Sequence, residues 1–301
     1  MIGAVRDVFK QTTIPYRTDV DTRTLSTFRI GGVCPLVIEP QCENELIEAI
    51  RICRLVGVRF AVIGRGSNLL FADGELKHVL IRAAALDALR PTQVGISAQA
   101  GCSLARLAHF AADRELSGLA FAAGIPGTLG GALVMNAGAY GKEIGTLVQS
   151  VTVLDICQAR VTVLSREELC FSYRSSLLQA RDLTVLSAEL ALPVRASRAA
   201  ILAEMAELAK RRRESQPLQQ PSAGSVFRRP ASGEPMGKVI EELGLKGLRC
   251  GNAAVSDKHA GFIVNLGGAT AADVLTLIEH IRKNVERERG FLPIPEIRYV
   301  P

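Results

Sequence analysis

Apolar residues recur every three or four positions in several stretches of the chain, and this spacing predicts amphipathic helices. In residues 43–57 they fall on one helical face, and Gly57 is a typical helix-ending residue. The other predicted helices cover residues 103–115, 197–213, 235–243 and 271–287. Ser103 and Thr270 are suitable N-caps, the latter with Asp273 behind it in the first turn.

Short apolar runs bounded by glycine, proline or polar residues predict strands between these helices. They cover residues 34–39, 60–63, 78–82, 95–100, 147–155, 160–164, 183–192, 262–265 and 296–300. The runs at 147–155 and 160–164 are close enough in sequence to form a hairpin. The order of elements therefore indicates βαβ-like units with many short strands.

The central stretch, residues 118–141, is rich in glycine and has no charged side chain. It is long enough for a membrane span, which needs about 20 apolar residues, but its glycines and Pro126 would interrupt a membrane helix. Glycine allows backbone N–H groups to approach a phosphate, and a short helix beginning near Thr128 would direct its positive end toward an anion. We therefore predict a water-shielded diphosphate site, the alternative being a glycine-rich core crossover without a ligand.

A second glycine loop, residues 64–68, follows the predicted strand at 60–63. Two such loops, each beside an apolar element, suit a large dinucleotide that lies across a domain. A Rossmann fold is the rival interpretation. It fits poorly, because neither loop has the G-x-G-x-x-G spacing ahead of a helix with an acidic residue about 20 positions further on.

Composition excludes a disordered chain, since 48% of the 301 residues are hydrophobic, and the length suits two domains or one large domain. The net charge of +6 raises the question of nucleic-acid binding. However, the dense basic run at 210–213 closes a predicted helix, so we interpret it as a solvated helix end. Few aromatic residues are available for base stacking. We expect a small polyanionic ligand and no nucleic acid.

The N-terminus and the cysteines indicate a cytoplasmic protein. Arg6 and Asp7 lie where a signal peptide would be apolar. The seven cysteines are odd in number and scattered without a C-x-x-C pair, which is typical of reduced thiols and predicts no disulfide or metal framework. A monomer without membrane insertion is our working expectation. Residues 216–224 have linker composition, and we place the main domain boundary there.

Eight short motifs follow one another along the chain. They are TFRIGG at 27–32, GRGSNLL at 64–70, GIPGTLGG at 124–131, MNAGAYG at 135–141, FSYRS at 171–175, SAGSVF at 222–227, KHAGFIVN at 258–265 and PEIR at 295–298. Together they make the chain resemble the UDP-N-acetylenolpyruvoylglucosamine reductase family, the flavoenzymes that complete UDP-N-acetylmuramate in peptidoglycan synthesis. Each motif alone is weak, whereas eight in order are specific.

The resemblance implies an α+β fold. Residues 1–215 would form an FAD-binding domain of the vanillyl-alcohol-oxidase type with two α/β lobes, and residues 216–290 a smaller α+β substrate-binding domain. Residues 291–301 would return as a strand to the active site. By the resemblance, FAD is bound non-covalently and NADPH is the co-substrate. The implied cofactor-binding residues are Gly64, Arg65, Gly66, Ser67, Asn68, Gly124, Ile125, Pro126, Gly127, Thr128, Gly130, Gly131, Asn136, Ala137 and Gly138.

Arg174, Ser225 and Glu296 match the family's three catalytic positions. Hydride delivery to the β-carbon of an enolpyruvyl ether leaves negative charge on the α-carbon and its carboxylate. An arginine offers a fixed fork for that carboxylate, and a protonated glutamic acid could donate a hydrogen bond to the enolate. The serine is then the proton donor to the α-carbon. Alone, each would be interpreted as an ordinary surface arginine, turn serine or strand glutamate.

Candidate substrate contacts are Tyr140, Tyr173, Arg228, Arg229, Lys258 and His259. His259 is equally well interpreted as a satisfied, half-buried imidazole. The pair Arg228-Arg229 stands where longer family members carry Lys-Asn, and no insert supplies their tyrosine loop, so the chain resembles the shorter subclass. Two other functions were weighed. One is an oxidase of the same fold acting on an alcohol or carbohydrate, and the other is a nucleotide-binding or nucleic-acid-binding module without catalysis.

Overall fold

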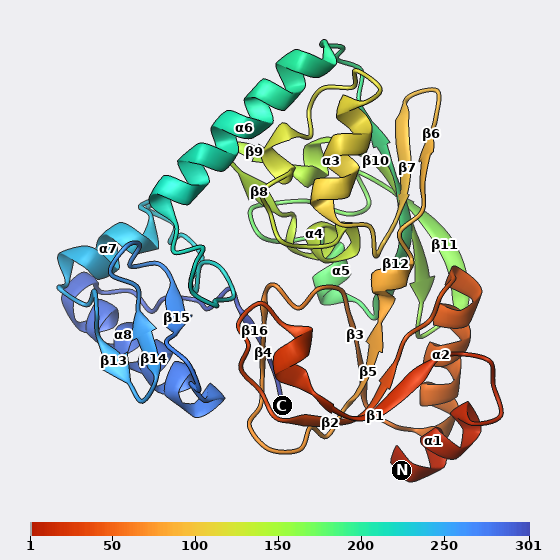
Figure 1. Ribbon diagram of the computed structural model, residues 1–301, viewed down its shortest axis with the longest axis horizontal. Helices are drawn as coiled ribbons and strands as arrows, with labels where there is room; N and C mark the ends of the chain where they lie inside the picture. Colours follow the sequence, from red (N-terminus) through yellow and green to blue (C-terminus); the bar gives the residue numbers. More distant parts are fainter. Residues whose placement is uncertain (1) are drawn as a thin grey trace. The chain divides into compact units, whose positions relative to one another are not determined.

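The computed structural model describes residues 2–301, which form two compact units (Figure 1). The first unit runs to Arg17 and includes Leu36–Arg65 and Val79–Arg212. The second consists of Thr18–Pro35, Gly66–His78 and Arg213–Pro301. Two early segments of the sequence thus belong with the C-terminal part. The domain limits suggested above, 1–215, 216–290 and 291–301, stay a prediction.

Parallel strands form one part of the first unit. β3 (Phe60–Ile63) and the end of β2 (Val33–Ile38) both pair in parallel with β5 (Val79–Arg82). The sheet order is β1-β2-β5-β3, with β1 at Tyr16–Asp21, and the nearby helices are α1 (Ile2–Phe9) and α2 (Glu43–Val56). Gly57 ends α2 in the left-handed conformation, as predicted.

Antiparallel strands form the other part of the first unit, in the order β11-β10-β12-β7-β6 (Figure 1). Their bounds are Arg160–Ser165, Val148–Asp155, Leu183–Ala191, Gly95–Gln99 and Leu89–Pro91. The predicted hairpin is confirmed as β10 and β11, which pair from Ser150↔Ser165 to Asp155↔Arg160. The βαβ-like expectation is wrong for the strand at 95–100, because β7 pairs antiparallel with β12 and β6.

Four helices accompany this sheet: α3 (Leu104–Ala112), α4 (Leu129–Met135), α5 (Leu177–Ala180) and α6 (Arg198–Ser215). Ser103 caps α3, whose apolar face joins one core cluster with the sheet. Two short strands, β8 (Gly138–Ala139) and β9 (Lys142–Glu143), follow α4. Among residues 2–301 there is no helix that is both long and apolar enough to cross a membrane.

The second unit contains β13 (Arg249–Cys250), β14 (Ala253–Val255) and β15 (Ile263–Asn265) in one antiparallel sheet. Helices α7 (Met236–Glu242) and α8 (Ala271–Arg289) share its core, and the predicted capping box of Thr270 and Asp273 is confirmed. β4 (Leu69–Phe71) pairs in parallel with β16 (Arg298–Val300). Phe28 and Ile30, distant in sequence, are buried in this same core.

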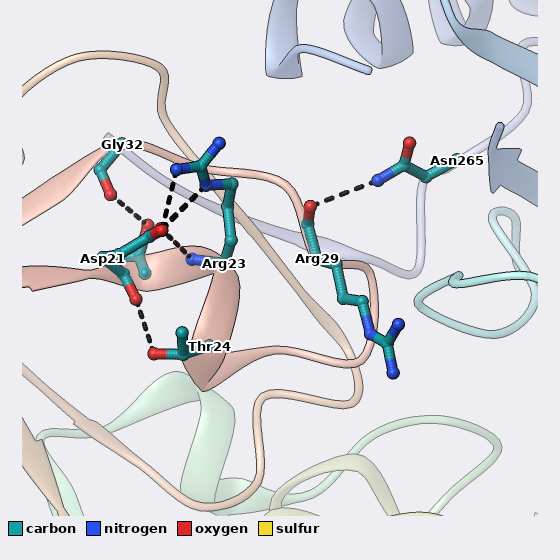
Figure 2. Close-up of polar contacts among 7 residues, drawn as sticks. Asp21, Arg23, Thr24, Arg29, Gly32 and Asn265 are labelled. Atoms are coloured by element: carbon teal, nitrogen blue, oxygen red, sulfur yellow. Dashed lines mark hydrogen bonds and ion pairs between the residues drawn. The ribbon is translucent and has the colours of Figure 1, made fainter. Parts of the chain in front are cut away.

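The buried side chain of Asn265 connects the early segment to the C-terminal part of this unit. Its amide nitrogen donates to the carbonyl oxygens of Phe28, at 3.2 Å, and Arg29, at 3.1 Å. Figure 2 shows the contact with Arg29. Its amide oxygen accepts from the backbone amides of Gly267 and Ala269. All hydrogen-bonding positions of this amide are therefore occupied.

We expect Asn265→Leu to lower the free energy of unfolding by about 2–4 kcal/mol, because buried backbone groups would lose their partners. Urea denaturation would measure the change. Asn284→Ala is the matched control, since that amide bonds within α8, and it should change the stability by less than about 0.5 kcal/mol. Equal effects of the two substitutions would contradict this assignment.

Candidate active site

Gly64, the first residue of the glycine loop at 64–68, lies against the loop at 124–131 in the first unit. A Cβ atom added to Gly64 would lie 2.3 Å from the hydroxyl oxygen of Thr128. No larger residue fits there without displacing its neighbour. Thr128 is also the N-cap of α4, where its side chain accepts from the backbone amide of Gly131. The first residue of one loop thus meets the start of the helix in the other.

The loop at 124–131 is held by the segment that precedes α3. The amide of Leu129 donates to the carbonyl oxygen of Cys102, and that of Gly130 to Ala100, both at 2.8 Å. In return, the amide of Leu104 donates to the carbonyl oxygen of Gly127. The loop is therefore fixed in shape by the protein itself, which favours a preorganised ligand site over a flexible one.

The remainder of the first glycine loop, Gly66–Asn68, belongs to the second unit. Gly66 has a φ of +64°, and an added Cβ would lie 2.1 Å from the carbonyl oxygen of Leu25. Within residues 2–301, the backbone amides of Gly66, Ser67 and Asn68 donate no hydrogen bond. Successive amides of this kind make a site that attracts anions.

Arg212 lies against the other loop. Its Cδ atom is 3.2 Å from the position of a Cβ atom added to Gly124. It is half-buried and has no ion-pair or hydrogen-bond partner among residues 2–301, and burial lowers the pKa of its guanidinium. The interpretation of 210–213 as a solvated helix end is therefore wrong for Arg212, because this part of α6 packs on the glycine loop. No signal in the sequence pointed to this role, because Arg212 is one of four consecutive basic residues at 210–213.

Each unit has features that suit an anionic ligand such as FAD. In the first unit, the backbone can approach a pyrophosphate where a Cβ would be excluded. In the second unit, the backbone amides of Gly66–Asn68 donate no hydrogen bond within residues 2–301. A guanidinium removed from water without a counter-charge is costly, and a phosphate would offset that cost.

Arg174 lies at the third position of a tight turn in which Ser172 and Ser175 exchange backbone hydrogen bonds of 3.1 and 3.0 Å. Its φ is +53°, in the left-handed region that is unfavourable for a residue with a Cβ. One guanidinium nitrogen donates to the carbonyl oxygen of Gly138 at 3.2 Å. Such a conformation persists only where the surroundings enforce it, and is more frequent at functional sites.

Asn136 is hydrogen-bonded to this turn. It ends α4 in the left-handed conformation, and its side chain is almost fully buried. Its amide nitrogen donates to Glu143 and to the carbonyl oxygen of Ser172, both at 2.8 Å, and its oxygen accepts from the amide of Gly145. The side chain of Asn136 is therefore engaged within the protein, which leaves its backbone as the group available to a cofactor.

Ser225 and Glu296, the other two predicted catalytic residues, lie on adjacent segments of the second unit. Ser225 is bridged to Phe262, and the next residue, Val226, accepts a hydrogen bond of 2.7 Å from the backbone amide of Glu296. Asn68 also joins this group, because its side chain donates to the carbonyl oxygen of Glu296 at 3.1 Å. Both catalytic candidates are half-buried.

The predicted substrate contacts are distributed over both units. Burial, and then the positive charge of Arg228, lower the pKa of Arg298. Arg229 is exposed, and Lys258 donates to the carbonyl oxygen of Arg213. Tyr173 is 45% exposed in the Arg174 turn. In the first unit, the hydroxyl of Tyr140 donates to the carbonyl oxygen of Leu208 on α6.

His259 is held by packing. Its Nδ1 accepts from the backbone amide of Gly261 at 3.1 Å, and its ring meets the edge of Phe262. Burial lowers the pKa of His259. These contacts agree with the interpretation of His259 as a half-buried imidazole that is held by the protein itself.

Comparison with known proteins identifies the class first. Residues 34–165 match the FAD binding domain family, and residues 216–300 match the family described as UDP-N-acetylenolpyruvoylglucosamine reductase, C-terminal domain. The protein is thus an FAD-containing oxidoreductase, and the predicted fold class and cofactor are confirmed.

Relatives named UDP-N-acetylenolpyruvoylglucosamine reductase cover nearly all of the chain. The protein of Caldanaerobacter subterraneus subsp. tengcongensis is 42% identical over 300 residues, which is 100% of this chain and 98% of the relative. That of Clostridium beijerinckii is 41% identical over 271 residues, or 90% and 88%. The crystal structure of the Thermus caldophilus reductase is 32% identical, with a TM-score of 0.78 over 96% of this chain and 99% of that one. The chain belongs to the UDP-N-acetylenolpyruvoylglucosamine reductase family.

We expect Gly64→Ala to weaken FAD binding by about tenfold or more, because the added methyl group collides with Thr128 and displaces the loop. Flavin fluorescence titration of the apoprotein would measure the affinity. Thr128→Ala in the same chain should restore part of it by removing the colliding atoms. Gly3→Ala, where nothing lies within 4 Å, is the control. An unchanged affinity of Gly64→Ala would contradict a role for this contact.

We expect His259 to make stability dependent on pH in one direction. Because its pKa is lowered in the folded protein, its contribution is complete above the ordinary value of about 6.5 and declines as the pH falls toward the lowered pKa. The difference in unfolding free energy between wild type and His259→Gln, measured in urea, should be larger at pH 8 than at about pH 5. Parallel curves would refute this expectation.

Proposed function

We propose that the protein reduces UDP-N-acetylglucosamine enolpyruvate to UDP-N-acetylmuramate with NADPH, in cytoplasmic peptidoglycan precursor synthesis. Its family supports the substrate, since full-length relatives carry that activity in their names. The observation that supports the cofactor site most directly is the approach of Gly64 to Thr128, because it joins two loops that could cradle one pyrophosphate. Bound FAD supplies hydride transfer between the nicotinamide and the enolpyruvyl double bond.

We assign the pyrophosphate to the backbone of residues 64–68 and 124–131, with Arg212 as the neutralising cation. The N-terminal end of α4 adds a favourable dipole beside Thr128. Arg212 matches this role because its guanidinium is not paired with a carboxylate among residues 2–301 and is therefore available to an anion next to Gly124. The cofactor-lining role of residues 136–138 is assigned to their backbone.

Three side chains receive roles in the reaction. Arg174 binds the substrate carboxylate through its planar fork, and Glu296, when protonated, donates a hydrogen bond to the enolate. Ser225 transfers its proton to the α-carbon, with Arg228 as a cationic neighbour. The position of Ser225 and Glu296 on adjacent, half-buried segments supports this assignment.

The second unit is the proposed location of the substrate diphosphate. Burial and then the positive charge of Arg228 lower the pKa of Arg298, and both guanidiniums are candidates to bind this diphosphate. Further candidates for substrate contacts are Arg229, Lys258, Tyr140 and Tyr173. His259 contributes packing in this proposal.

Purified protein should be yellow and should oxidise NADPH only when UDP-N-acetylglucosamine enolpyruvate is supplied. An absorption spectrum tests for bound flavin, and the loss of NADPH absorbance with and without the substrate tests the activity. A colourless protein that cannot be reconstituted with FAD would end the proposal. Flavin retained after acid precipitation would favour a covalent oxidase of the same fold.

Ser225→Ala should slow the reoxidation of reduced flavin by substrate by about 100-fold or more, because the α-carbon loses its proton donor. Reduction of the flavin by NADPH should be unchanged. Stopped-flow absorbance of the two half-reactions measures both rates. Ser232→Ala, on an exposed turn, is the control. Equal loss in both half-reactions would count against proton donation.

A further inference from the structure

We infer that Gln179 is a positioning residue for Arg174, fixing the left-handed turn of the arginine to the C-terminal end of α4. This inference rests on the proposed role of Arg174 in binding the substrate carboxylate. Gln179 belongs to the short helix α5 and has no part in the sites described above.

The amide group of Gln179 connects two carbonyl oxygens. Its Nε2 atom donates to the carbonyl oxygen of Val134 at 2.7 Å and to that of Arg174 at 3.0 Å. A primary amide has two N–H groups, so one nitrogen can serve both acceptors. The reverse orientation would place the amide oxygen against two carbonyl oxygens, which the hydrogen-bond pattern excludes.

The acceptor on α4 is a carbonyl group of the last helical turn, where no backbone partner is available. Ser176 donates to the same Val134 oxygen at 2.9 Å, so two side chains attach α5 to this helix end. Gln179 also bonds the carbonyl oxygen of Arg174, whereas the bond of Ser176 ends at Val134. The C-terminal end of α4 is thereby attached through Gln179 to the turn that contains Arg174.

The held group is the carbonyl of Arg174 itself. The orientation of this peptide plane, together with the φ of +53°, decides where the Arg174 side chain leaves the backbone. Without the bond to Gln179, the turn could relax toward the ordinary right-handed region, which a residue with a Cβ prefers. The guanidinium would then move away from the Gly138 carbonyl oxygen that it now contacts.

Asn136 acts at a different point of the turn. It holds the carbonyl oxygen of Ser172, two residues before the arginine, and it also binds Glu143 and Gly145. Its replacement would disturb β8 and β9 as well as the turn. Gln179 is therefore the more selective position at which to alter the geometry of Arg174.

The test compares variants in the two half-reactions of the holoenzyme. Gln179→Glu keeps the shape of the side chain but removes the donors, and Gln179→Leu removes them without adding charge. Each should slow reoxidation of reduced flavin by UDP-N-acetylglucosamine enolpyruvate by about tenfold, the loss expected for one or two hydrogen bonds. Reduction by NADPH should stay within about twofold of wild type.

Ser176→Ala is the matched control, because it removes a bond to the same Val134 oxygen and leaves the bond to Arg174. It should change either half-reaction by less than about twofold. Gln179→Lys, which retains a long donor side chain, should keep most of the wild-type rate of reoxidation. In an Arg174→Ala background, Gln179→Leu should have no further effect on reoxidation, since its action passes through the arginine.

Three outcomes would overturn the inference. These are an unchanged rate in both Gln179→Glu and Gln179→Leu, an equal loss in Ser176→Ala, or the same additional loss in the Arg174→Ala background. Failure of the proposed function is recognised separately, because wild-type reduced flavin would then not be reoxidised by the substrate at all. Hydrogen exchange of residues 171–176 gives a readout independent of turnover, and it should be faster in Gln179→Leu than in Ser176→Ala.

Discussion

The short helix α4 is the element on which the rest of the proposed chemistry depends. At its first turn, Thr128 lies so close to Gly64 that a side chain at position 64 would collide with its hydroxyl group. At its last turn, Val134 and Asn136 are bonded to the segment that holds Arg174. A helix of only seven residues therefore connects the proposed cofactor cradle to the proposed carboxylate-binding arginine. A displacement at one end is expected to reach the other, because close-packed interiors have few soft contacts.

Positive charge beside a glycine loop is the second feature. Arg212 lies against Gly124 in the first unit, half-buried and without an ion-pair partner among residues 2–301. This arrangement is costly in the protein alone and becomes favourable with an anionic ligand. The proposed anionic ligands would account for part of the net charge of +6.

Local patterns predicted most of the elements. Helices α2, α3, α6, α7 and α8, the hairpin of β10 and β11, and the caps at Ser103 and Thr270 all follow from spacing and capping rules. The elements that were missed are α1, α5, the six-residue strand β1, and shorter strands such as β4, β6, β13 and β14. Strands of two or three residues have too little periodicity to detect, and their pairing depends on distant partners.

The amino-acid sequence by itself determined the glycine loops, the eight motifs that define the family, and the residue types available for catalysis, because these depend on neighbours within a few positions. Only the tertiary structure decided that Gly64 meets Thr128, that Arg212 is half-buried, and that Gln179 holds Arg174. It likewise decided that Phe28 and Ile30 belong to the core of the second unit. The reason is physical: such contacts join residues far apart in the chain, and they are selected by packing and hydrogen bonding of the whole fold rather than by local preference.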